Sequence, residues 1–132
     1  MRERSILSMV VVLLLLAVGV TATQAGKSTA TFEGKYDWAQ GGNDELRVDF
    51  KPDGEDRWKV AFRFHFSGRK ETWSGTAVGS LHDGSTLTGT ATSGGRNWIF
   101  KAGIENGVMR GTHREVKRGG REYATGTFEV SR

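Results

Sequence analysis

The sequence predicts an all-β domain in which about eight antiparallel strands follow one another as a meander. Three observations lead to this fold class. Apolar side chains recur at every second position over most of residues 31–130. Short segments rich in Gly, Asp, Asn and Ser interrupt these runs at close intervals, as turns do. No stretch has sustained helical spacing, and no connection has the dozen or more residues that a parallel crossover needs.

The amino-terminal segment, residues 1–25, is predicted to be a signal peptide rather than part of the domain. Two arginines precede an apolar run over residues 6–20, and small and polar residues follow it. Residues 23–25 fit a small-x-small cleavage site, so we expect cleavage after Ala25, with Ala22 as the second choice. The apolar run is short for a bilayer span of about 20 residues, which makes an uncleaved anchor the weaker alternative.

The remaining chain, residues 26–132, is long enough for one domain with a modest core. It has no cysteine, which excludes disulfides, thiol catalysis and cysteine-ligated metals. Its net charge is +3, because the leader removes two Arg and one Glu from a total of +4. Acidic and basic residues are interspersed, so charge alone predicts no nucleic-acid partner. We expect an exported bacterial protein, either periplasmic or secreted.

Eight strands are expected between the turns, and each pairs with the next because the connections are short. The sheet then closes into a barrel or splits into a two-sheet sandwich, and closure is favoured because it leaves no strand edge exposed. Asn106-Gly107 has the residues of a type I′ hairpin turn. The expected strands are 31–38, 45–51, 57–66, 69–81, 86–92, 96–103, 107–116 and 121–130.

The first three strands place large apolar side chains on one face and charged side chains on the other. In the third strand Phe62, Phe64 and Phe66 share the apolar parity. Arg63 and His65 share the polar parity, so we expect both to face solvent rather than to carry chemistry.

The later strands place glycine and alanine on the apolar face instead. A Gly-Thr pair recurs at Gly75, Gly89, Gly111 and Gly126, and Ala124 shares the face of Gly126. Glycine is usually unfavourable inside a strand, so its repetition predicts strong bending or the close approach of a bulky neighbour. A filled core, with large side chains packed against small ones, is slightly favoured over a ligand cavity.

The seventh strand carries the sharpest candidates for chemistry. The same register turns His113 and Glu115 toward the apolar face, where a buried imidazole needs a hydrogen-bond partner. The functional hypothesis is that both form the polar end of a pocket, where they orient a ligand or act as an acid–base pair. The alternatives are a structural core histidine and a one-residue register slip, which Val108 and Val116 favour.

The main functional hypothesis is a non-enzymatic barrel that binds a small hydrophobic or aromatic molecule. Its expected cavity residues are Tyr36, Trp38, Trp58, Trp73, Trp98, His113 and Glu115. A small enzyme that uses His113 with Glu115 is less favoured, because no catalytic motif is present. The three histidines are too scattered to predict a metal site, and no cofactor is expected.

A further alternative is an interaction module that uses its outer surface. Basic side chains gather around the last hairpin, where they can bind an anion, an envelope polymer or nucleic acid, although two glutamates dilute them. No nucleic-acid partner is clearly indicated, and no membrane association is expected once the leader is removed. The basic residues are Arg110, Arg114, Lys117, Arg118 and Arg121.

In architecture the predicted meander resembles the barrels of the avidin and lipocalin type. The resemblance rests on the strand number, the short turns and an aromatic first strand, FEGKYDW at residues 32–38. It implies a closed barrel that can hold a ligand in its lumen. No binding motif of either family is matched, so the resemblance assigns no site residue here.

Overall fold

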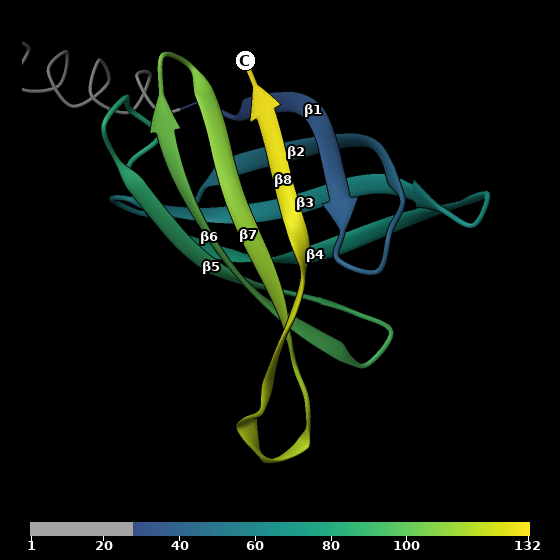
Figure 1. Ribbon diagram of the computed structural model, residues 1–132. Coiled ribbons are helices and arrows are strands. Elements are labelled where there is room, and N and C mark those ends of the chain that lie inside the picture. The colour runs from purple at the N-terminus through teal and green to yellow at the C-terminus, as the bar shows by residue number, and fades with distance from the viewer. Residues whose placement is uncertain (1–27) are drawn as a thin grey trace, which may run out of the picture.

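The computed structural model describes residues 28–132, which form one closed barrel of eight antiparallel strands (Figure 1). Each strand pairs with the next, and the last pairs back with the first, which confirms the closed meander and excludes the sandwich. All of this pairing lies within residues 30–131, so the barrel is complete without the predicted leader, which falls outside the described residues. The strands are β1 (Ala30–Trp38), β2 (Asn43–Pro52), β3 (Arg57–Phe66), β4 (Arg69–Gly79), β5 (Thr86–Ser93), β6 (Arg96–Glu105), β7 (Val108–Val116) and β8 (Glu122–Ser131).

Tight turns connect most of the strands where the sequence predicts them. Asn106 and Gly107 have φ values of 52° and 76°, which agrees with the expected type I′ turn. The strand β4 ends earlier than expected, at Gly79 with φ 135°, and the chain then places Leu81 in the core. A short 3₁₀ helix at Arg118–Gly120, in the β7–β8 connection, was not predicted.

The barrel interior is filled by the side chains of the predicted apolar parity. In β3, Phe62 and Phe64 are buried, whereas Arg63 and His65 are exposed, as expected. Phe66 shares the apolar parity but is 48% exposed, because it is the last residue of β3, at the end of the barrel wall.

The predicted close approach of neighbouring groups to the strand glycines is present. Gly89 is paired with Phe100 and Gly111 with Phe128, and the aromatic ring covers the glycine in each pair. A Cβ atom on either glycine would lie within about 2.5 Å of that ring. At Gly75 the close neighbour is backbone instead, since a Cβ there would lie 1.7 Å from the carbonyl oxygen of Thr90. Glycine at these positions therefore lets an aromatic ring or a neighbouring strand approach closely.

A bulge in β8 corrects one sequence prediction. His113 pairs with Gly126, but Arg114 pairs with Ala124, so Thr125 is an extra residue in the ladder. The bulge reverses the parity before Thr125, and Ala124 is therefore exposed rather than on the inner face. Tyr123 instead pairs with Glu115.

The barrel has two distinct ends. One end is bounded by the connections 39–42, 67–68, 94–95 and 117–121, and we call it the tryptophan end because Trp38, Trp73 and Trp98 lie near it. The opposite end is bounded by the connections 53–56, 80–85 and 106–107. The β7–β8 hairpin at the tryptophan end projects well beyond the barrel body (Figure 1). Among the described residues no helix has the length and apolar character that crossing a bilayer requires.

Candidate functional site

Aromatic side chains from several strands converge at the tryptophan end. Trp73 of β4 and Trp98 of β6 stack face to face, with ring centroids 3.7 Å apart and planes 13° apart. Trp38, the last residue of β1, packs edge-on against Trp73 at 5.7 Å and against His113 at 5.2 Å. Phe64 closes the group at 5.2 Å from Trp73. Such pairs are worth about 0.5–1.5 kcal/mol each beyond the burial of their surface.

A cavity of about 20 Å³ remains inside this aromatic cluster. About 10–15 Å³ is enough for one water molecule, so the cavity is of water size and closed to larger molecules in this arrangement. The predicted site residues that line it are Tyr36, Trp38, Trp73, Trp98 and His113.

Trp58, also expected in the cavity, lies at the opposite end of the barrel. Its indole N–H donates to the carbonyl oxygen of Gly79 at 2.9 Å, and its ring packs edge-on against Phe50. The sequence parity placed Trp58 on the correct face but could not place it along the barrel axis.

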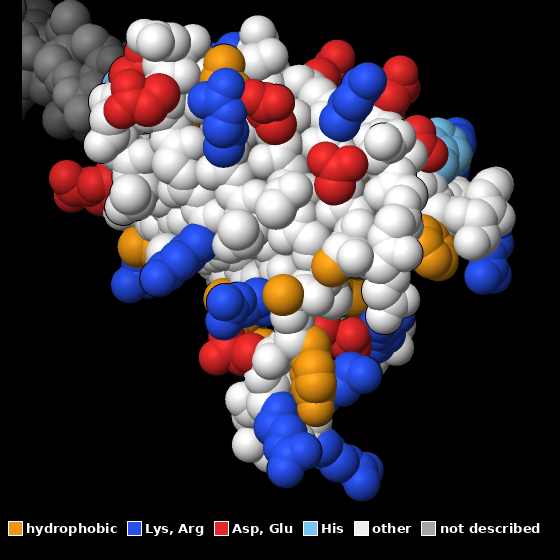
Figure 2. Space-filling view, in the orientation of Figure 1, with side chains coloured by type: hydrophobic (Ala, Val, Ile, Leu, Met, Phe, Trp, Pro, Cys, Tyr) orange, Lys and Arg blue, Asp and Glu red, His pale blue; other side chains and the backbone are white. Residues whose placement is uncertain are grey.

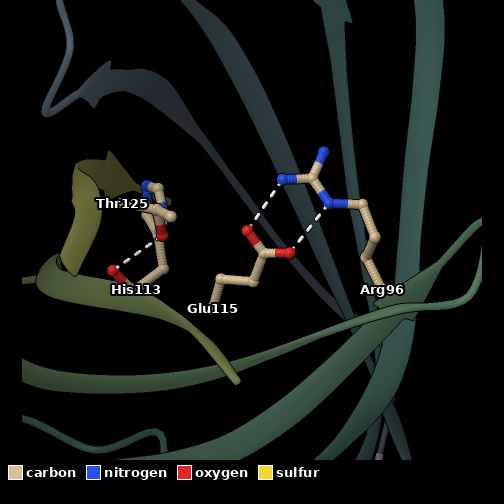
Figure 3. A network of polar contacts seen from close by, with 4 residues as sticks. All are labelled: Arg96, His113, Glu115 and Thr125. Atoms are coloured by element: carbon tan, nitrogen blue, oxygen red, sulfur yellow. Dashed lines mark hydrogen bonds and ion pairs between the residues drawn. The ribbon is translucent and has the colours of Figure 1, made fainter. Parts of the chain in front are cut away.

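His113 is buried on the inner face, which confirms the predicted register over the one-residue slip. Its Nδ1 lies 2.6 Å from the hydroxyl oxygen of Thr125, and that hydroxyl donates to the carbonyl oxygen of His113 at 3.0 Å (Figure 3). If the Thr125 hydroxyl proton goes to this carbonyl, Nδ1–H donates to Thr125 and Nε2 carries the lone pair. The β8 bulge therefore places the hydrogen-bond partner of the imidazole.

The environment keeps the His113 imidazole neutral. Burial disfavours the charged form and lowers its pKa from 6.5 to about 4. At neutral pH the ring is therefore uncharged, and its Nε2 lies close to Gly126 of β8.

Glu115 is also buried, but it forms hydrogen bonds with Arg96 and not with His113. Its two carboxylate oxygens accept hydrogen bonds from Nε and Nη2 of Arg96, at 2.9 and 2.8 Å. The Arg96 guanidinium lowers the pKa of Glu115 through these bonds, against the opposing effect of burial. The carboxylate lies at the rim of the barrel, where the Arg96 side chain shields it from solvent. The Arg96 side chain itself is 61% exposed. In Figure 3 the carboxylate points toward Arg96 and away from His113.

Two buried polar atoms of the cluster have no partner. Within residues 28–132, the indole N–H groups of Trp38 and Trp98 are both buried and form no hydrogen bond. The Tyr36 hydroxyl near Trp38 instead donates to the carbonyl oxygen of His65 at 2.6 Å. Burial raises the pKa of Tyr36, and the nearby Trp38 indole partly offsets this rise although it does not reach hydrogen-bond geometry. Native proteins satisfy most buried donors, so these two N–H groups are exceptions within the described chain.

A hollow of about 330 Å³ lies on the surface over the ends of β1, β7 and β8. Trp38 and His113 line this hollow and also line the inner cavity. These two rings therefore form the partition between a ligand-sized space outside and the aromatic cluster inside.

No protein-family model matches the chain, and comparison with curated proteins and with solved structures gives no match. Among the described residues no group of three His, Asp or Glu side chains is arranged to hold a metal ion.

The basic residues expected to form a surface patch are only partly brought together. Lys117, Arg118 and Arg121 share the projecting β7–β8 connection, next to Arg114 on β7. Arg110 lies in the other half of β7, where it forms an ion pair with Glu129 at 2.7 Å.

Sequence reasoning missed Arg96 and Thr125, the partners of Glu115 and His113. A signal for Arg96 was present, because a two-residue turn at Asn106-Gly107 fixes the register of β6 against β7. That register pairs Trp98 with Glu115 and makes Arg96 a diagonal neighbour on the same face. Thr125 could not be found this way, because it reaches His113 only through the bulge.

Proposed function

We propose that the chain is an exported, non-enzymatic binding protein for a small, flat, largely apolar molecule that carries a hydrogen-bond acceptor and a donor. The ligand enters at the tryptophan end by displacing the Trp38 ring, and it then occupies the space of that ring together with the adjoining cavity. The observation that carries this proposal is the position of Trp38 and His113, which separate the surface hollow from the inner cavity.

Trp38 has the features of a displaceable side chain. It is only partly buried, whereas Trp73 and Trp98 are buried. It ends β1, and the turn that follows is joined to its backbone by hydrogen bonds with Gly41 and Gly42, whose Cβ positions face open space. An outward rotation of Trp38 also lets water satisfy its orphaned N–H, which offsets part of the packing that is lost.

The polar groups that remain in the site after Trp38 has rotated outward define the ligand chemistry. Trp98 supplies an N–H donor that has no partner within the described chain, and His113 supplies Nε2 as an acceptor. The other walls are apolar. The vacated space is that of one indole ring, so the geometry favours a bicyclic aromatic molecule with one acceptor and one donor on its edge.

The arrangement does not favour an acid–base enzyme. His113 and Glu115 are held by separate partners, Thr125 and Arg96, and no hydrogen bond joins them. With a pKa near 4, the imidazole is also a weak base at neutral pH.

Benzimidazole is a suitable probe, because it is a neutral bicycle with one acceptor and one donor. Calorimetric titration of the chain from Gly26 onward should give saturable binding. Indene, of similar shape but without these polar atoms, should bind at least about fivefold more weakly, since each lost hydrogen bond costs roughly 0.5–1.5 kcal/mol. Equal binding of the two molecules would contradict the proposed polar contacts.

Three single variants separate the roles of the tryptophans. Trp38→Ala removes the ring that must move, so benzimidazole affinity should rise. Trp98→Phe removes the N–H donor, so affinity should fall about two- to tenfold. Trp58→Phe is the matched control at the opposite end and should leave affinity unchanged. An affinity that does not change in Trp38→Ala or Trp98→Phe would place any binding elsewhere on the barrel.

A further inference from the structure

The charges of the connecting segments are polarised along the barrel axis. At the tryptophan end the four connections carry Lys117, Arg118 and Arg121 and no acidic residue, a formal charge of +3. At the opposite end the three connections carry two aspartates and one glutamate in residues 53–56 and Asp83, a formal charge of −4. The sequence alone does not show this polarity, because consecutive connections lie at alternate ends of the barrel.

The positive charge is concentrated on the projecting β7–β8 hairpin. Figure 2 shows Lys and Arg side chains gathered at the tip of this hairpin, beyond the barrel body. Within residues 28–132, none of Lys117, Arg118 and Arg121 forms an ion pair. Gly119 and Gly120, both with φ near +80°, shape the turn that presents them.

Exposed aromatic rings lie at the same end of the barrel as this charge. Three large apolar side chains are notably exposed in the described chain, and two of them, Phe66 at 48% and Tyr123 at 45%, belong to the tryptophan end. The Lys117 ammonium lies 5.1 Å over the Tyr123 ring. Aromatic rings beside lysine and arginine are the combination found where proteins meet the headgroup region of a bilayer.

We propose that the tryptophan end docks on a lipid bilayer that contains anionic headgroups, with the β7–β8 hairpin as the main contact. The acidic connection 53–56 at the opposite end is flanked by Lys51, Arg57 and Lys59, so the attraction comes from the hairpin rather than from repulsion of the other end. The sequence alone gave no expectation of membrane association, because the leader was the only apolar segment in it. Docking in this orientation also turns the Trp38 end of the barrel toward the bilayer. The docking itself does not depend on ligand binding.

The expected effect of the three basic residues follows from surface electrostatics. A lysine or arginine near an anionic bilayer strengthens binding by about fivefold, so three together contribute roughly a hundredfold. This attraction is screened by salt and absent on a neutral surface. Tyr123 and Phe66 add a smaller, salt-independent part.

The test is co-sedimentation of the chain from Gly26 onward with vesicles, either of phosphatidylcholine alone or with one third phosphatidylglycerol, in low salt. We expect binding to the anionic vesicles only, and its loss as the salt concentration rises. The triple variant Lys117→Gln/Arg118→Gln/Arg121→Gln should bind roughly a hundredfold more weakly. The matched control Lys51→Gln/Arg57→Gln/Lys59→Gln removes the same charge from exposed positions toward the opposite end and should retain nearly all binding.

Three outcomes would overturn the proposal. The first is no binding to the anionic vesicles in low salt. The second is an equal loss in both triple variants, which would show that net charge rather than the hairpin matters. The third is a short DNA duplex, at equal phosphate concentration, that displaces the chain from the vesicles completely, since that would identify an anionic polymer as the preferred partner. None of these outcomes bears on benzimidazole binding, which uses other residues.

Discussion

Replacing Gly75 with alanine should prevent the barrel from closing normally. The new Cβ would lie 1.7 Å from the carbonyl oxygen of Thr90 and 2.8 Å from the Cα atom of Ala91, which is the cross-strand partner of Gly75. Both neighbours are backbone, so no side chain can rotate away and the strands must separate. We expect the free energy of unfolding to fall by at least about 3 kcal/mol, and the Tm by more than about 10 °C.

Gly103→Ala is the matched control, because Gly103 also lies inside a strand but has nothing within 4 Å of its Cβ position. Alanine there should leave stability unchanged or raise it by up to about 1 kcal/mol, since it restricts the unfolded chain. Thermal and urea unfolding of both variants measure the contrast. Similar stabilities for Gly75→Ala and Gly103→Ala would show that the strands do not approach as closely as described.

Acid should destabilise the barrel through His113. The folded state keeps this imidazole neutral down to a pKa of about 4, whereas in the unfolded chain it is protonated below about 6.5. Between these values the unfolded state binds the extra proton, so stability falls as the pH is lowered. The difference in pKa corresponds to about 3 kcal/mol, which is fully lost only near pH 4.

His113→Asn removes this titration and still offers a side-chain N–H to Thr125. The variant should therefore lose about 3 kcal/mol less than the native chain when urea unfolding is compared at pH 7 and pH 4. His82→Gln, which removes an exposed histidine, serves as the control and should behave like the native chain. Parallel pH profiles for the native chain and His113→Asn would mean that His113 is protonated in the folded barrel.

Much of the fold could be predicted because period-two patterning is local. The register of Phe62 and Phe64, the inward position of His113 and the type I′ turn at Asn106-Gly107 all follow from neighbouring residues. Short connections then leave a meander as the only simple topology. The pairing of β1 with β8, which closes the barrel, is the long-range element that the rule against exposed edges predicted correctly.

The site was harder to predict because it depends on position along the barrel axis and on one irregularity. Parity correctly places Trp58 and Trp38 on the same face of the sheet. It does not show that the two residues lie at opposite ends of the barrel. The bulge at Thr125, which orients His113 and moves Ala124 to the surface, has no clear sequence signature. The charge polarity appears only when the alternating connections are assigned to the two ends.

The most direct test of the binding site is the set of indole N–H resonances in a ¹H–¹⁵N spectrum, which four tryptophans make small enough to assign by single Trp→Phe variants. On titration with benzimidazole, the resonances of Trp38 and Trp98 should shift strongly and in parallel to a common saturation point. The Trp58 resonance should stay in place, because its N–H is bonded to Gly79 at the far end. Unmoved Trp38 and Trp98 signals at saturating probe, or a Trp58 signal that moves with them, would contradict a ligand site at the tryptophan end.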